Sequence, residues 1–99
     1  MGKYKFTNEA VEDLSAIWNY TLDNWSESQA DKYYRFILES CQEIADNPDL
    51  GKNYEGIARN LFGLKVNRHI IFYRKLSSSL IEITRILHER MDLKNRMNE

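Results

Sequence analysis

Cysteine, proline and glycine are scarce in this chain, and each scarcity removes a class of protein. The 99 residues include one cysteine, so no internal disulfide can form and a reducing compartment suits the chain. One proline and four glycines leave little sequence for flexible linkers. The chain also has no apolar run long enough to cross a bilayer and no signal-peptide pattern. We therefore expect a cytoplasmic protein that does not contact membranes.

Motifs that hold cofactors or metals are missing as well. The sequence has no phosphate-binding loop, no pair of cysteines at zinc-ligand spacing and no nucleophile elbow, so we expect neither a cofactor nor a metal. What the chain does have is apolar residues at 42%, with 12% aromatics, which is typical of a folded protein. A chain of this length suffices for one modest core, so we expect a single domain over residues 1–99.

Charge is divided unevenly between the two halves of the chain. Residues 1–50 carry four basic and ten acidic side chains, a net charge of −6, whereas residues 51–99 carry ten basic and five acidic ones, a net charge of +5. Such a division indicates a charged partner for one half, or merely two solvated outer faces.

The first half predicts a strand followed by a helix. Residues 3–7 alternate, with Tyr4 and Phe6 on one face, which is typical of a short strand. Asn8 is a suitable helix cap, and apolar residues then recur at spacings of three and four until about Asp23.

A second helix is predicted directly after the first. Ser26 and Gln29 form a capping box, and the helix should end at Asn47 because Pro48 forces the preceding residue out of helical geometry. Since the connection between the two apolar-striped helices is short, we expect them to pack as an antiparallel hairpin.

The second half predicts three strands. Residues 49–58 are expected to form a loop, and strands are expected at 61–67, 69–76 and 80–87, the last two apolar enough to be covered on both faces. Residues 89–96 add a short helix or stay extended. The predicted fold is α+β: an N-terminal strand, an antiparallel helix hairpin, then a three-strand antiparallel meander, with the helices packed on one sheet face.

Basic residues of the second half are the main candidates for chemistry. Arg68 and His69 lie at the predicted hairpin, and Arg85, His88 and Arg90 follow on or beside the last strand. Arginine with histidine can bind phosphates, and histidine titrates near neutrality, so acid–base cleavage of RNA is chemically possible. The competing interpretation is that the two histidines cap strand ends through hydrogen bonds, and we favour it because no matched acid–base pair stands out.

The remaining reactive or aromatic side chains have structural explanations. Cys41 lies in the apolar stripe of the second helix, so we expect it to be buried and inert. The carboxylates at the start of the first helix, Asp13 among them, are explained by compensation of the helix macrodipole. Trp18 and Trp25 are expected to pack in the core, although Trp25, at the junction of the helices, is also a candidate for exposure to a partner.

Short motifs run through nearly the whole chain in a fixed order. They are Tyr4-x-Phe6, Ala10-Val11-Glu12-Asp13-Leu14-x-x-Ile17-Trp18-x-Tyr20, Trp25, Gln29-Ala30, Pro48-x-x-Gly51, His69-x-Ile71-Phe72-Tyr73-Arg74 and Ile86-Leu87-His88-x-Arg90-Met91-Asp92. In this order and in a chain of this length, they resemble the ParE toxins of the RelE/ParE superfamily of bacterial toxin–antitoxin modules.

The resemblance implies a toxin that inhibits DNA gyrase by binding it. It also implies a ParD-like antitoxin that wraps and silences the toxin, with DNA contacted only indirectly, through the antitoxin complex. The residues expected to bind the target are Arg85, His88, Arg90, Met91 and Asp92. Those expected to bind the partner are Trp18 and Trp25.

The superfamily also implies an alternative function, a RelE-like ribosome-dependent mRNA endonuclease. Its catalytic residues here would be Arg68, Arg85 and His88. No tyrosine follows His88, although the superfamily nucleases place a tyrosine or histidine near the end of the last strand within a basic cluster. We therefore expect no catalytic residue and keep the nuclease as the alternative.

Overall fold

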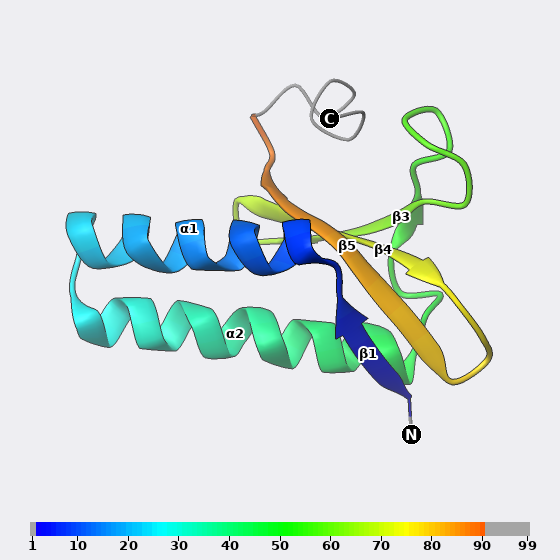
Figure 1. Cartoon of the computed structure of the whole chain (residues 1–99), viewed down its shortest axis with the longest axis horizontal. Coiled ribbons are helices and arrows are strands. Elements are labelled where there is room, and N and C mark those ends of the chain that lie inside the picture. Colours follow the sequence, from blue (N-terminus) through cyan, green and yellow to red (C-terminus); the bar gives the residue numbers. More distant parts are fainter. Residues whose placement is uncertain (1, 91–99) are drawn as a thin grey trace.

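The protein consists of one mixed sheet and one helical hairpin (Figure 1). The computed structural model describes residues 2–90, which form β1 (Lys3–Phe6), α1 (Asn8–Asn24), α2 (Glu27–Asp46), β2 (Lys52–Asn53), β3 (Phe62–Val66), β4 (His69–Lys75) and β5 (Leu80–His88). The strand order is β1-β5-β4-β3-β2, with β1 parallel to β5 and the other neighbours antiparallel. The predicted α+β fold is confirmed, including the helix hairpin on one sheet face and the antiparallel meander.

Each helix is capped at its start by a residue whose hydroxyl accepts a hydrogen bond from a backbone amide. Ser26 Oγ accepts from Gln29 N at 3.1 Å, as predicted for α2. At α1 the predicted cap was wrong by one residue. Asn8 is already helical, and Thr7 is the cap, with its Oγ1 accepting from Ala10 N at 3.0 Å. Thr7 is better placed because its backbone is extended and its hydroxyl also reaches β5.

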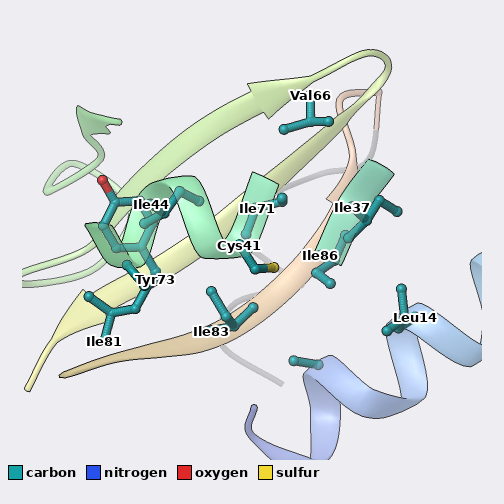
Figure 2. Close-up of a cluster of buried hydrophobic side chains, with 12 residues drawn as sticks. Leu14, Ile37, Cys41, Ile44, Val66, Ile71, Tyr73, Ile81, Ile83 and Ile86 are labelled. Carbon is teal, nitrogen blue, oxygen red and sulfur yellow. The ribbon is translucent and has the colours of Figure 1, made fainter. Parts of the chain in front are cut away.

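The main core lies between the helices and the sheet (Figure 2). Cys41 is buried there, as predicted, among apolar side chains of α1, α2, β3, β4 and β5. The largest of the fully buried side chains facing this core are Ile37, Ile44, Ile71, Tyr73, Ile81 and Ile83. Neither helix within residues 2–90 has the length and apolarity that crossing a membrane requires.

The far face of the sheet is covered by the segment that precedes β3. Ile70, Phe72 and Leu87 form a second cluster with Leu61, against which Tyr54 and its neighbours pack. The prediction that the last two strands are covered on both faces is therefore confirmed. The predicted loop at 49–58 instead contains β2, which pairs with β3. A strand of two residues is too short to show the alternation from which strands are predicted.

Tight turns connect the last three strands. Asn67 has a φ of 57°, a left-handed conformation that asparagine tolerates, and this conformation lets β3 and β4 form the predicted hairpin through a two-residue turn. After β5, Glu89 and Arg90 form a turn rather than a helix. The remainder of the segment 89–96, for which a helix or an extended chain was expected, lies outside the described residues.

Tyr73 attaches the loop after α2 to the sheet. Its ring is completely buried, and its hydroxyl donates to the carbonyl of Pro48 at 2.7 Å and accepts from Gly51 N at 2.9 Å. A Cβ on residue 51 would lie 2.6 Å from that hydroxyl, so glycine is needed at this position. One side chain thus satisfies two backbone groups that would otherwise be buried without partners.

We predict that Tyr73→Phe destabilises the fold by about 1–3 kcal/mol, since it leaves the carbonyl of Pro48 and the amide of Gly51 without their partner. Urea unfolding followed by circular dichroism measures the loss. Tyr20→Phe is the matched control because Tyr20 is 66% exposed and should leave the midpoint unchanged. Equal midpoints for both variants would contradict the role assigned to the Tyr73 hydroxyl.

Candidate functional site

The candidate site lies on the second half of β5, which extends past its neighbour β1. β1 pairs with β5 only from Leu80 to Ile83, whereas β5 continues to His88. The unpaired edge from residue 84 to residue 88 carries two of the residues predicted from the sequence, Arg85 and His88. An exposed strand edge leaves backbone amides and carbonyls without partners unless another element supplies them.

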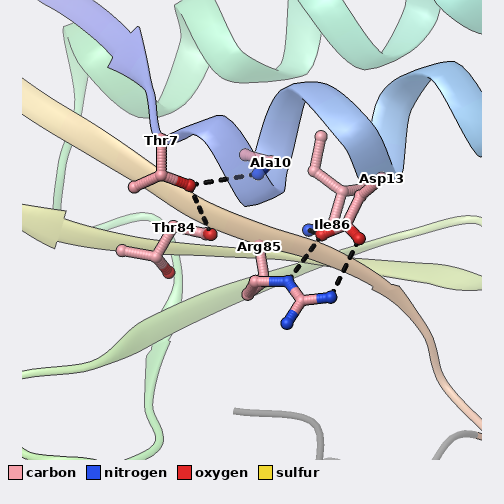
Figure 3. A network of polar contacts seen from close by, with 6 residues as sticks. All are labelled: Thr7, Ala10, Asp13, Thr84, Arg85 and Ile86. Atoms are coloured by element: carbon pink, nitrogen blue, oxygen red, sulfur yellow. Dashed lines mark hydrogen bonds and ion pairs between the residues drawn. The ribbon is translucent and has the colours of Figure 1, made fainter. Parts of the chain in front are cut away.

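Helix α1 supplies those partners in place of a strand (Figure 3). Thr7 N donates to the carbonyl of Ile83 at 3.0 Å, and Thr7 Oγ1 donates to the carbonyl of Thr84 at 2.8 Å. Six residues further on, Asp13 Oδ2 accepts from Ile86 N at 3.0 Å. The chain therefore leaves β1 and continues along the same edge of β5 as a helix, with side chains replacing backbone hydrogen bonds.

Asp13 also holds the guanidinium of Arg85. Nε of Arg85 lies 2.8 Å from Oδ2 and Nη2 lies 3.0 Å from Oδ1, which is a two-pronged ion pair. The side chains are only 16% and 13% exposed, so the pair is largely shielded from water. The carboxylate of Asp13 thus accepts three hydrogen bonds from β5.

This contact corrects the interpretation of Asp13 as compensation for the helix macrodipole. The partner is 72 residues away in the sequence, so no local pattern identifies it. One signal was available, since position 13 is three residues after Ala10 and four before Ile17, on the apolar stripe of the predicted helix. A carboxylate on a stripe that packs on the sheet requires a buried partner.

A β-bulge determines where Arg85 lies. Phe72 pairs with Arg85 and the next residue, Tyr73, pairs with Ile83, so Thr84 is an extra residue in β5. As a result Ile83 and Ile86, three residues apart, both pack in the core beneath the helices. Arg85 lies opposite Phe72, whose ring packs in the cluster on the far face of the sheet.

The two histidines lie side by side at the other end of the same strand pair. His69 and His88 are directly opposite in the register, with ring centroids 5.4 Å apart and an interplanar angle of 81°. His69 Nδ1 is 2.6 Å from the hydroxyl of Tyr33 on α2, and His88 Nδ1 accepts from Arg90 N at 3.1 Å. The interpretation that both histidines make strand-end hydrogen bonds is therefore confirmed.

Burial sets the protonation of the groups around His69. Burial lowers the pKa of His69. The charge of His88 lowers that pKa further, and the charge of Glu89 raises it. Burial likewise raises the pKa of the Tyr33 phenol. The contact between Tyr33 and His69 therefore joins a phenol and an imidazole that are both neutral near pH 7. No local pattern in the sequence indicates this contact, because α2 and β4 are far apart in the chain.

Charges of both signs surround the histidine pair. Lys65 Nζ lies 2.8 Å from a carboxylate oxygen of Glu89, and the hydrogen bond from Lys65 lowers the pKa of Glu89. The amide of Glu89 also donates to the carbonyl of Arg68 at 2.9 Å, while the Arg68 and Arg90 residues are exposed. A rim of mixed sign is less suited to a phosphate backbone than a purely basic one.

Of the three residues of the nuclease alternative, Arg85 and His88 lie on opposite faces of the sheet, and Arg68 lies in the turn next to His69. His88 lies opposite His69, which contacts Tyr33 of α2 on the helix side of the sheet. Arg85 lies opposite Phe72 on the far side, with its guanidinium held at the edge by Asp13. Of the other residues expected to bind the target, Arg90 follows His88 in the turn, and Met91 and Asp92 lie outside the described residues.

The tryptophans occupy different environments. Trp25, at the end of α1, is 74% exposed, so the expectation that it packs in the core was wrong. The helix ends there, and the side chain extends from the tip of the hairpin. Trp18 is partly buried on α1. Tyr20, on the same helix, is also strongly exposed.

The remaining candidates for chemistry are inert. Burial raises the pKa of the Cys41 thiol to about 12, so it is neither a thiolate nor accessible at neutral pH. Within residues 2–90, no three histidine, cysteine or carboxylate side chains cluster as metal ligands would.

The α+β fold of this chain has a counterpart among solved structures. A solved structure titled "Chromosomal ParDE TA system from P. aeruginosa" superposes with a TM-score of 0.74, over 89% of this chain and 95% of that chain, at 20% sequence identity. At this identity the similarity establishes the fold alone.

Sequence comparison establishes the family. The profile described as "ParE toxin of type II toxin-antitoxin system, parDE" matches residues 4–93. Toxin ParE1 of Mycobacterium tuberculosis is 32% identical over 91 residues, covering 92% of this chain and 93% of that protein. Toxin ParE1 of Caulobacter vibrioides is 30% identical over 92 residues, covering 93% and 94%. The chain therefore belongs to the ParE toxin family of type II toxin–antitoxin systems.

We predict that Asp13→Asn destabilises the protein by about 3 kcal/mol, because it leaves the shielded guanidinium of Arg85 without its counter-charge. Thermal or urea unfolding measures the change. Glu12→Gln is the control, since it makes the same chemical change one residue earlier on an exposed position. If the two variants are equally stable, the ion pair does not hold α1 to β5.

Proposed function

We propose that this chain is a toxin that inhibits DNA gyrase by binding it, without chemistry of its own, and that a ParD-like antitoxin neutralises it. Membership of the ParE family supports the class of target. We favour binding over cleavage because Arg85 and His88 lie on opposite sides of the sheet.

Cleavage of RNA needs an acid, a base and a phosphate-binding group that converge on one bond. Here the candidate groups make hydrogen bonds to other parts of this chain. Arg85 is paired with Asp13, His69 Nδ1 is bonded to Tyr33, and His88 Nδ1 accepts the amide of Arg90. These contacts satisfy the side chains locally, so they favour a structural use of the residues over a catalytic one.

The proposed target-binding surface is the end of β5 and the segment after it. Its residues are Arg85, His88, Arg90, Met91 and Asp92. The described part is held in place by Asp13 on one side and by His69 on the other. Binding surfaces built on such a fixed strand end lose little conformational entropy when they engage a partner. The cytoplasm is the proposed compartment, because gyrase acts there.

The proposed antitoxin-binding residues are Trp18 and Trp25. An amphipathic helix of the antitoxin would lay its apolar face against these two side chains, as in other helix-in-groove complexes. DNA would be contacted by the antitoxin rather than by this chain, whose charged rim around His88 carries Glu89 together with its basic residues.

We predict that the purified protein inhibits gyrase supercoiling and that Arg90→Ala raises the concentration for half-inhibition about tenfold, the effect of losing one central interface contact. Arg35→Ala is the control, since Arg35 is an exposed arginine on α2, away from β5. A parallel reaction with translating ribosomes tests the alternative. Cleavage of mRNA that His88→Ala abolishes in a folded protein would establish the RelE-like nuclease and exclude the proposed mechanism.

We predict that Trp25→Ala weakens binding of the antitoxin at least about tenfold without changing the stability of the toxin. The side chain is mostly in water, so its removal opens no cavity. Titration calorimetry with the small protein encoded beside the toxin gene measures the affinity. Leu76→Ala, which truncates an exposed apolar side chain between β4 and β5, should leave affinity unchanged. Equal affinities of the two variants would exclude Trp25 from the interface.

A further inference from the structure

Both histidines of the chain occur in one contact. The sequence contains two, and the register places them opposite each other as the first residue of β4 and the last residue of β5. Their rings meet edge to face. Histidine is the only side chain whose ordinary pKa places its change of charge between about pH 5 and pH 8. Any titration of side chains near pH 6 is therefore concentrated at this one point of the fold.

Each imidazole makes, through Nδ1, a hydrogen bond that the neutral ring can satisfy. His88 Nδ1 accepts a hydrogen bond from the amide of Arg90. A proton on that nitrogen would therefore make two hydrogen-bond donors face each other. His69 Nδ1 is bonded to the hydroxyl of Tyr33, which also lies 3.5 Å from the carbonyl of Val66. The hydroxyl can reverse its role if His69 is protonated, but the imidazolium would then be partly buried directly opposite His88. Like charges directly opposite on antiparallel strands destabilise the pair.

The groups packed around the pair do not offset two positive charges. Tyr33 faces it from α2 and is neutral, Arg68 precedes His69 in the turn after β3, and Arg90 follows in the turn after β5. The acidic group at hand is Glu89, and Lys65 of β3 already forms an ion pair with it. Burial and the charge of His88 both lower the pKa of His69, and Glu89 only partly opposes them.

We propose that the His69–His88 pair is an acid-sensitive joint, which fastens the end of β5 to β4 and α2 when both imidazoles are neutral and loosens as they become charged. A base whose pKa is lower in the folded protein than in the unfolded chain is protonated first in the unfolded chain. Stability is therefore full above the ordinary pKa of histidine and is lost as the pH falls through that value. The device goes beyond the proposed function and does not depend on it.

Urea unfolding of the wild-type protein at about pH 7.5 and about pH 5.5 tests the joint, because this window spans the histidine titration. We expect the unfolding equilibrium constant to rise at least about threefold on acidification. His69→Gln should remove most of that rise, and His88→Gln should reduce it, because burial of His69 and the charge of His88 opposite it act together. Tyr20→Phe, at an exposed position outside the pair, should retain the wild-type pH dependence.

Equal pH dependence in the wild type and both glutamine variants would overturn the proposal. A pH dependence in His88→Gln equal to that of the wild type would also overturn it, because it would show one isolated histidine rather than a pair. Should a variant fail to fold, proton NMR of the wild-type imidazoles decides instead. The pair predicts that His69 titrates below its ordinary range and that its signals respond to His88. Two independent, ordinary titration curves would refute the joint.

Discussion

The carboxylate of Asp13 completes a sheet edge that β1 is too short to cover. β1 has four residues and β5 has nine, so half of β5 would expose its backbone groups at the edge. Asp13 accepts the amide of Ile86 and binds the guanidinium of Arg85 in the same place. A shielded charge is costly unless it is paired and fully hydrogen-bonded, and this arrangement meets both conditions. The attachment of α1, and with it the helix hairpin, depends on it.

The same attachment positions the candidate site. Asp13 holds β5 at its outer edge, while β4 holds it on the inner side through a register that continues to His88. The turn after β5 is fixed by the amide of Glu89 on the carbonyl of Arg68 and by the amide of Arg90 on His88. The chain therefore leaves the sheet in a defined direction. A binding surface gains from such pre-organisation, whereas an enzyme needs its groups to converge as well.

Local patterns in the sequence predicted the elements, and long-range contacts account for most of what they missed. The helix cap at Ser26 and the apolar strands were predicted correctly because helix starts and burial are encoded by neighbouring residues. Thr7 was missed as the cap because its second bond is to Thr84. The contact of Tyr33 with His69 joins residues 36 apart in the sequence. Trp25 was misplaced because apolar character alone does not separate a core residue from one on an exposed hairpin tip.

The bulge at Thr84 shows why the position of Arg85 could not be predicted from the alternation of the strand alone. Strict alternation from Ile81 and Ile83 would place residue 85 beneath the helices. The extra residue reverses the alternation, so Ile86 enters the core and Arg85 turns to the other face, from which its guanidinium meets Asp13 at the edge of the sheet. The bulge has a cost, because the Thr84 hydroxyl is buried with no hydrogen-bond partner among the described residues. The separation of Arg85 from His88 does not depend on the bulge, because residues three apart in a regular strand lie on opposite faces of the sheet.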